Sequence, residues 1–311
     1  MDTTTILPGD AGYPDPLMTL AAAGALDPPA LFLRGALPTA PGICVVGTRA
    51  PTDGARDFTR TLVRELAGAG FSLWSGGARG IDAEVHEAAL DAGAPTVVVV
   101  GGGLGRLYPP EHGPLFSRVL DAGGALLARA PDEAPPTPPA FLRRNELLAA
   151  LSVATVVIQA GLTSGARSTA AAARRLGRPL CVVPHAPWDD RGAGCALELA
   201  RGGARPIVSA AEVLASLSAG LAPPPRRPPR PKRRRAAAEG APEAQNKLFT
   251  ELSPDERVVL AVLGTEPMHL DEIQERSNFP FPRLLAALLT LTLGTVVVEG
   301  PAGFYRQVNR P

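Results

Sequence analysis

The sequence SGGARGID, residues 75–82, follows a short apolar run at 71–74 and precedes a stretch of helical character at 83–92. Adjacent glycines let a ligand approach the backbone closely, and a helix start presents free N–H groups and the positive end of its dipole. Arg79 adds a cation to this turn. These residues predict an anion site, for either a free nucleotide that is cleaved or the phosphates of a nucleic acid that is held.

Similar residues follow other apolar runs. Arg49 comes directly after the first run, GGGLGRLYPPEH occupies residues 101–112, and GLTSGARSTA occupies 161–170. FLRRNELLAALS, residues 141–152, adds Phe141, which either stacks a base or belongs to the core, and two arginines, which contact phosphates or lie on a solvated face. A row of loops that combine glycine with arginine or serine favours a polymer backbone over one small nucleotide.

Several kinds of catalytic and cofactor site do not fit this pattern. The GxGxxG dinucleotide fingerprint is missing after the first apolar run, and neither GxxxxGKS nor GxxxxGKT occurs, which argues against NAD, FAD and P-loop nucleotides. The histidines and cysteines lack metal-ligand spacing. Asp82 is either a helix cap or a functional carboxylate, and His86 is more typical of a hydrogen-bonded core residue than of a catalyst. We therefore expect neither a metal nor a cofactor.

The elements that position these residues alternate between strands and helices from residue 42 onward. Continuous apolar strands separated by helices predict an α/β fold with a Rossmann-like, doubly wound and mostly parallel sheet, and ligands of such sheets lie beyond the carboxyl ends of the strands. The predicted strands are 43–46, 71–74, 96–100, 125–128, 153–159, 180–183 and 206–208. The predicted helices are 53–69, 82–92, 113–121, 143–151, 165–176 and 194–200.

Composition divides the chain into four parts. Residues 1–40 are too poor in apolar residues to form a core of their own, so we expect this extension to pack on the sheet domain at 41–219. Residues 220–247 contain a proline and arginine tract that predicts an extended linker. Residues 248–311 predict three helices and a hairpin, a small winged-helix domain that begins with Ser253 as helix cap and Pro254 in the first turn.

Charge and composition also limit the environment and the partners. Residues 41–222 hold 17 arginines and 16 acidic residues, residues 223–235 hold seven basic residues, and residues 248–311 hold five arginines against eight acids. No apolar run is long enough to cross a membrane, and the first ten residues do not resemble a secretory signal. With three scattered cysteines, the chain is expected to be a reduced, cytoplasmic protein that does not bind a membrane.

Five motifs in fixed order resemble the DprA/Smf family of DNA-processing proteins of natural transformation. That family shows VGSR, SGLARGID with a histidine four residues on, GxGLDxxYPxxN, FPxRNRIIAGLS and SGSLITA. This chain has VGTR, SGGARGID with His86, GGGLGRLYPPEH, FLRRNELLAALS and TSGARSTA. The resemblance extends over about residues 13–308, because RRLGRPLCVVPH and the C-terminal sequence LSPDERVVLAVL also match family segments.

The resemblance implies a protein that is not an enzyme, binds single-stranded DNA, protects incoming DNA, forms a homodimer through the Rossmann-like domain and loads the recombinase RecA. The strand ends and the resemblance together imply these DNA contacts: Arg49, Ser75, Gly76, Gly77, Arg79, Gly80, Gly101, Gly103, Arg106, Phe141, Arg143, Arg144, Asn145, Ser164, Gly165 and Arg167.

The chain departs from the family motifs at Gly105, His112, Leu142, Glu146, Arg167, Ser168 and His185. Glu146 places a negative charge near the expected phosphates, and Arg167 is a candidate to compensate it. An alternative function is a nucleotide hydrolase similar to the phosphoribohydrolases, which carry PGGxGTxxE, whereas this chain has the glycines without the GTxxE continuation. A second alternative is a transcription regulator that reads duplex DNA with its winged helix, which the acidic charge of that domain disfavours.

Overall fold

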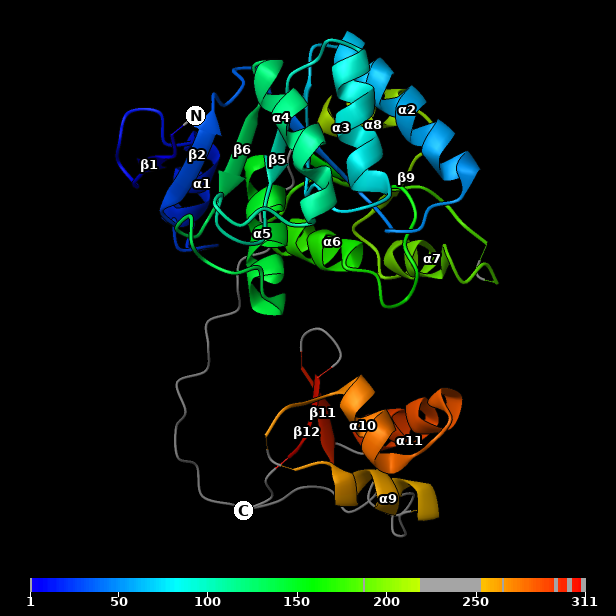
Figure 1. Cartoon of the computed structure of the whole chain (residues 1–311). Helices are drawn as coiled ribbons and strands as arrows, with labels where there is room; N and C mark the ends of the chain where they lie inside the picture. Colours follow the sequence, from blue (N-terminus) through cyan, green and yellow to red (C-terminus); the bar gives the residue numbers. More distant parts are fainter. Residues whose placement is uncertain are drawn as a thin grey trace. The chain divides into compact units, whose positions relative to one another are not determined.

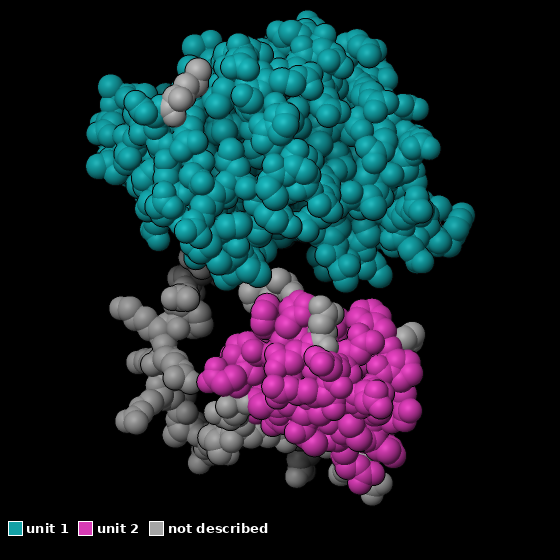
Figure 2. Space-filling view, in the orientation of Figure 1, with its two compact units in different colours: residues 1–228 teal, residues 229–311 magenta. Residues whose placement is uncertain are grey.

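The computed structural model describes residues 2–186, 188–218, 253–264, 266–293, 296–300 and 304–308. The chain divides into two compact units, residues 1–228 and residues 229–311 (Figure 2). The predicted linker at 220–247 lies outside the described residues. No helix in the described part of the chain is both long and apolar enough to span a membrane.

The first unit contains a nine-stranded sheet with the order β1-β2-β6-β5-β4-β3-β7-β8-β9 (Figure 1). The strands from β3 to β9 are parallel, and β1 and β2 add an antiparallel edge through the pairing of β2 with β6. This arrangement confirms the predicted α/β class. The strands are β1 (Thr4–Ile6), β2 (Leu31–Gly35), β3 (Gly42–Val46), β4 (Ser72–Ser75), β5 (Thr96–Val99), β6 (Ala125–Ala128), β7 (Ala154–Val157), β8 (Leu180–Val182) and β9 (Arg205–Pro206).

Helices cover both faces of this sheet (Figure 1). One face packs against α2, α3, α4 and α8, and the other against α1, α5, α6 and α7. These helices are α1 (Asp15–Ala22), α2 (Asp53–Gly68), α3 (Ile81–Asp91), α4 (Gly113–Asp121), α5 (Pro138–Leu151), α6 (Ala166–Arg175), α7 (Ala193–Ala200) and α8 (Ala210–Ser218), with a short 3-10 helix, η1 (Pro110–His112), before α4.

The central strands are apolar throughout because both faces are buried. In β3, Ile43 and Val45 belong to the core under α2 and α3, whereas Cys44 and Val46 belong to the core under α5 and α6. Side chains alternate between the two faces of a strand, so a strand covered on both sides needs apolar residues at every position. Because β3 to β9 run parallel, their carboxyl ends lie at the same edge, where the glycine-rich loops begin.

Helix α5 starts five residues earlier than the sequence pattern predicts. The Thr137 side chain caps it by accepting a hydrogen bond from the Ala140 backbone N–H at 3.4 Å. Pro138 and Pro139 fit in the first turn, where no backbone N–H donor is needed, so the two prolines start this helix instead of excluding it. This earlier start places Phe141 and Arg144 on one helix, three residues apart and on the same side.

The second unit is a winged-helix domain, whose described residues form three helices and a small antiparallel sheet of order β10-β12-β11. Its elements are α9 (Pro254–Val262), β10 (Met268–His269), α10 (Leu270–Ser277), α11 (Phe281–Leu293), β11 (Val297–Glu299) and β12 (Phe304–Gln307). Ser253 and Glu256 form a reciprocal capping box at the start of α9, as predicted for Ser253. Val259, Ile273 and Leu284 contribute to a separate core.

Candidate nucleic-acid interface

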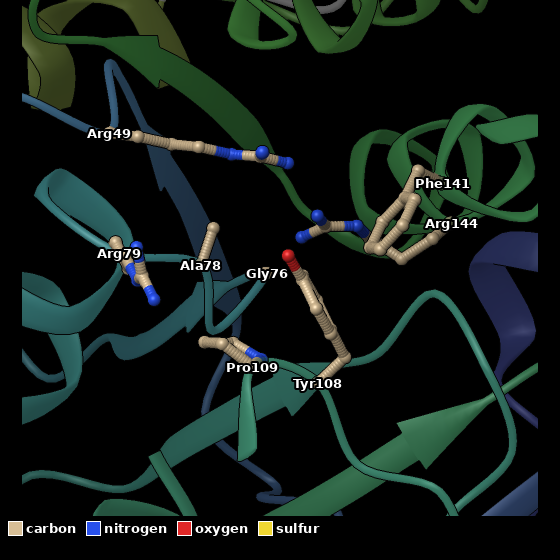
Figure 3. A pocket seen from close by; sticks show the side chains of 8 residues that line it. All are labelled: Arg49, Gly76, Ala78, Arg79, Tyr108, Pro109, Phe141 and Arg144. Atoms are coloured by element: carbon tan, nitrogen blue, oxygen red, sulfur yellow. The ribbon is translucent and has the colours of Figure 1, made fainter. Parts of the chain in front are cut away.

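A pocket of about 180 Å³ lies at the carboxyl edge of the parallel strands (Figure 3). Four chain segments form it: the loop after β3, the SGGARGID loop after β4, the glycine-rich loop after β5, and the first turns of α5. The residues that line it are Arg49, Gly76, Ala78, Arg79, Tyr108, Pro109, Phe141 and Arg144. The side chains of Arg49, Arg144 and Tyr108 converge on the same space in the close view.

The SGGARGID loop is held in shape by Asp82, the second residue of α3. Its Oδ2 accepts hydrogen bonds from the backbone N–H groups of Gly76 at 3.2 Å and Ala78 at 3.4 Å. Asp82 therefore uses its carboxylate on its own loop, and its backbone partners lie directly beside the pocket. This arrangement does not fit the helix-cap interpretation of Asp82, because Gly80 is the residue that caps α3 and Asp82 lies inside the helix. Its side-chain oxygen instead satisfies loop N–H groups that would otherwise lack partners.

Arg144 forms a buried ion pair with Asp82. Arg144 Nη1 lies 3.6 Å from Asp82 Oδ2, and each side chain is only 7% exposed. Burial raises the pKa of the Asp82 carboxyl, and the positive charge of Arg144 acts in the opposite direction and lowers it. Burial lowers the pKa of the Arg144 guanidinium, and the negative charge of Asp82 raises it. The Arg144 Nε is buried without a hydrogen-bond partner among the described residues. The guanidinium is thus fixed at the pocket wall.

Two glycines of the SGGARGID loop allow it to pack closely, Gly80 against the loop after β3 and Gly77 against Val98 of β5. Gly80 has a φ of +78°, and a Cβ atom there would overlap the Thr48 carbonyl oxygen. Ile81 N–H donates to that same oxygen at 3.2 Å. Gly77, with a φ of +69°, leaves no room for a side chain against Val98. Both glycines are therefore required for close packing and backbone conformation, and Gly80 brings Arg49 to the edge of the pocket.

Arg49 and Arg79 supply the exposed cations of the pocket. Arg49 has no hydrogen-bond or ion-pair partner among the residues that the structure describes. The guanidinium of Arg79 pairs instead with Glu111 in η1. The two arginines thus line one pocket but differ in their electrostatic state, because only the charge of Arg79 is neutralised by a nearby carboxylate.

Two aromatic rings form one wall of the pocket. Tyr108 and Phe141 meet edge to face with their centroids 5.9 Å apart, and Tyr108 is 45% exposed. The Arg144 guanidinium carbon lies 5.8 Å from the Phe141 ring centroid. Gly101 is necessary because a Cβ atom there would overlap the Phe141 ring. Phe141 is partly buried, so it contributes both to packing and to the pocket surface.

Several predicted contacts lie outside the pocket and have structural partners. The Ser75 hydroxyl is buried and donates to the Val45 carbonyl at 2.7 Å. Gly103 packs against the backbone of residues 131–132, and its N–H donates to the Ala134 carbonyl at 2.9 Å. Arg106 lies 3.7 Å from Glu133. These residues shape the loops around the pocket. Three residues that do line the pocket, Ala78, Tyr108 and Pro109, are absent from the predicted contacts.

The predicted contacts around α5 and α6 mostly join these two helices. Asn145 Nδ2 donates to the Gly165 carbonyl at 3.3 Å and to the Ser168 hydroxyl at 2.5 Å. The Ser164 hydroxyl accepts from the Ala166 N–H at 3.3 Å at the start of α6. Arg143 is exposed on α5 and does not line the pocket. The loop after β7 is thus tied to α5 beside the pocket.

Two of the departures from the family motifs form ion pairs away from the pocket. Arg167 lies 3.0 Å from Glu198, a fully buried carboxylate that also pairs with Arg174 and Arg201. Glu146 pairs with Arg129 at 3.3 Å and with Arg175. Arg167 therefore does not compensate the charge of Glu146. No signal in the sequence indicates the pairs of Arg167 and Glu146, because their partners are far apart along the chain.

The described residues contain no cluster of three or more histidine, cysteine or acidic side chains that could hold a metal ion. His86 is fully buried, and its Nδ1 lies 2.8 Å from the Thr96 hydroxyl oxygen. Because that hydroxyl donates to the Leu73 carbonyl, His86 must donate from Nδ1. Burial lowers the pKa of His86 to about 3. His86 is thus a neutral core residue remote from the pocket surface.

Comparisons with known proteins connect this architecture to one family. The family described as DNA recombination-mediator protein A matches residues 4–218, and the DprA winged helix domain matches residues 223–303. Protein Smf of Escherichia coli is 32% identical over 288 residues, which cover 90% of this chain and 72% of that protein. Protein Smf of Synechocystis is 31% identical, over 97% of this chain and 79% of that protein.

Two solved structures are also similar. DprA of Streptococcus pneumoniae superposes with a TM-score of 0.61 and 28% identity, covering 68% of this chain and 73% of that one. DprA of Helicobacter pylori, whose structure was described for its single-stranded DNA binding mode, has a TM-score of 0.59 and 29% identity, covering 70% and 96%. These matches confirm the resemblance found in the motifs: the chain belongs to the DNA recombination-mediator protein A family, whose members include DprA and Smf.

Proposed function

We propose that this protein binds single-stranded DNA in the pocket at the carboxyl edge of its sheet, protects incoming DNA and delivers the strand to RecA during natural transformation and recombination. We further propose that it acts as a homodimer through its Rossmann-like unit. Membership of a recombination-mediator family supports delivery of the strand to a recombinase. RecA as that recombinase, and the homodimer, are what the resemblance of the motifs to DprA and Smf implies. The single-stranded DNA bound by the Helicobacter pylori relative supports the choice of ligand.

The observation that carries the proposal is one pocket that combines guanidinium groups with two aromatic rings, Tyr108 exposed and Phe141 partly buried. Arg49 and the fixed Arg144 can donate to phosphate oxygens, and Tyr108 and Phe141 offer ring surface beside them. Unpaired bases are free to stack on aromatic side chains, whereas bases in a duplex stack on one another. This combination therefore favours a single strand.

The same pocket argues against nucleotide hydrolysis. Among the described residues that line it, none carries a carboxylate. The nearest acids have other partners, because Asp82 holds its own loop and Glu111 pairs with Arg79. Hydrolysis that uses a carboxylate as general acid or base would need one within reach of the substrate. Incubation with nucleoside monophosphates should release no free base, and base release would establish the hydrolase instead.

The test of the proposed function compares labelled oligo-dT with a duplex of equal length by fluorescence anisotropy across a salt series. We expect tighter binding to oligo-dT, and affinity that falls with salt by a log–log slope of about 0.7 per neutralised phosphate. Arg49→Ala should weaken oligo-dT binding by roughly tenfold or more, since hydrogen bonds to charged groups contribute roughly 1.5–3 kcal/mol.

Arg64→Ala is the matched control. Arg64 is an exposed arginine in the last turns of α2, without a hydrogen-bond or ion-pair partner among the described residues, and α2 runs from the pocket edge toward the opposite edge of the sheet. Equal losses in Arg49→Ala and Arg64→Ala would show that net charge, and not this pocket, governs binding. RecA delivery is tested separately by measuring RecA filament formation on the same oligonucleotide with and without the protein.

A further inference from the structure

The guanidinium of Arg79 is already occupied by a carboxylate in the free protein. Its Nε and Nη2 both contact Oε1 of Glu111. Arg79 belongs to the SGGARGID loop after β4, whereas Glu111 belongs to η1 after the glycine-rich loop, so the pair joins two loops that border the pocket. Both side chains are substantially exposed, at 68% for Arg79 and 41% for Glu111. A ligand can therefore reach the pair.

The three arginines of the pocket differ in what neutralises them. Arg144 has a buried partner in Asp82, which no ligand can replace without opening the loop. Arg49 has no partner in the described part of the chain. Arg79 alone of the three has an exposed partner, Glu111. A phosphate that binds Arg79 through Nε and Nη2 displaces this carboxylate, because both anions then accept hydrogen bonds from the same two donors.

Glu111 is suited to return to Arg79 once a phosphate leaves. Its own backbone N–H and the Arg79 side chain hold the pKa of Glu111 below its ordinary value, so the carboxylate is ionised at neutral pH. It sits in the short η1 helix, which continues into α4, and its backbone is therefore held close to Arg79. An exposed ion pair is weak, so a DNA phosphate can open the Arg79–Glu111 pair. The Glu111 carboxylate nevertheless stays beside Arg79 and can pair with it again.

We propose that Glu111 is an internal competitor that replaces a DNA phosphate on Arg79 and thereby accelerates release of the bound strand. This inference rests on the proposed function. It assigns Glu111 a role in dissociation, in contrast to the arginines, which promote binding. A protein that passes a strand to another protein must release that strand. A competing carboxylate weakens the contact between Arg79 and a phosphate without removing it.

The test measures dissociation of labelled oligo-dT from the full-length protein after addition of excess unlabelled oligo-dT. Glu111→Gln keeps the size of the side chain but removes its charge. We expect it to slow dissociation by about two- to fivefold, the range that an exposed ion pair spans. Glu87→Gln is the control, because Glu87 is an exposed carboxylate on α3 without a partner among the described residues. It should leave the dissociation rate unchanged.

A double-mutant cycle separates competition from a general charge effect. If Glu111 acts through Arg79, Glu111→Gln should change the rate little in an Arg79→Ala background. The same slowing in both backgrounds, or faster dissociation of Glu111→Gln alone, would overturn the inference, and the second result would mean that Glu111 positions Arg79 for DNA. If wild type binds and Glu111→Gln has no effect, only this inference fails. If no variant binds oligo-dT, the proposed function fails with it.

Discussion

The guanidinium of Arg144 occupies the space that a side chain at Gly76 would need. A Cβ atom on Gly76 would overlap Arg144 Nη1, and the same glycine donates its N–H to Asp82, the partner of Arg144. The loop and the arginine therefore form one packed unit, in which the glycine admits the cation and the carboxylate holds both. Glycine at this position is needed for a close approach and not for an unusual backbone angle.

Gly76→Ala should displace Arg144 from the pocket wall and weaken binding of oligo-dT by roughly tenfold, because at least one charged hydrogen bond to phosphate is lost. Overpacking of this buried loop should also lower the free energy of unfolding by about 1–3 kcal/mol. Gly54→Ala is the control, since Gly54 lies in α2 and a Cβ atom there meets nothing within 4 Å. Anisotropy and urea unfolding measure the two effects, and unchanged binding would remove Arg144 from the interface.

Arg167→Ala should affect stability more than DNA binding. Arg167 donates to the buried Glu198, and its removal leaves that carboxylate with Arg174 and Arg201. We expect a loss of about 1–3 kcal/mol in the free energy of unfolding, typical of a weakened buried charged network, with oligo-dT affinity changed less than about twofold. A loss of affinity as large as that of Arg49→Ala would instead extend the interface over α6.

His86 should make the protein less stable as the pH falls. Its pKa is lowered from 6.5 to about 3 by burial. Above pH 6.5 the imidazole is neutral in both states, whereas between pH 6.5 and 3 the unfolded chain binds a proton that the folded chain does not. The free energy of unfolding therefore decreases over this window, by up to about 1.4 kcal/mol per pH unit.

The variant His86→Leu should flatten this pH dependence. Leucine fits an apolar site, and Thr96 keeps its hydrogen bond to the Leu73 carbonyl. Urea unfolding of wild type and His86→Leu at several pH values between 6.5 and 4 measures the difference in slope. Equal slopes would show that His86 takes up a proton without unfolding, and hence that it is accessible to water in the folded protein.

The sequence predicts the central sheet well because its strands are buried on both faces and read as continuous apolar runs. The sequence pattern does not predict the edge strands β1 and β2, since both are short, and β2 is held by pairing with β6 while β1 is held by pairing with β2. The glycine-rich strand ends correctly indicate the edge where the pocket lies, because parallel strands share one carboxyl edge.

The sequence does not show which charges are available to a ligand. Arg143 and Arg144 are adjacent, yet one is exposed on α5 and the other lies in the pocket. Successive residues of a helix point about 100° apart, and only the packing of α5 decides which of them faces the pocket. The pairs Arg79–Glu111 and Arg167–Glu198 each join residues about thirty positions apart. Neither helical nor strand periodicity relates such residues, so only the tertiary fold reveals that these arginines are neutralised.

Removal of the winged-helix domain should preserve most binding of single-stranded DNA. Its third helix, α11, carries Arg283 as its one charged residue, and this side chain donates to both carboxylate oxygens of Asp255, at 2.6 and 2.7 Å. Recognition of duplex DNA by a helix requires unpaired cations that reach phosphates and base edges. The described residues of α11 offer no such cation, so the pocket of the first unit should account for the affinity.

Two truncations separate the winged helix from the basic segment. Residues 1–247 keep the seven basic residues at 223–235, and residues 1–218 remove them. We expect 1–247 to bind oligo-dT like the full chain, and 1–218 to lose affinity mainly at low salt, because any contribution of the segment is electrostatic and screened by salt. Loss of binding by 1–218 at every salt concentration would assign DNA binding to the C-terminal part. Loss of binding by both truncations would assign DNA binding to the winged helix. That result would contradict the expectation drawn from the pairing of Arg283 with Asp255.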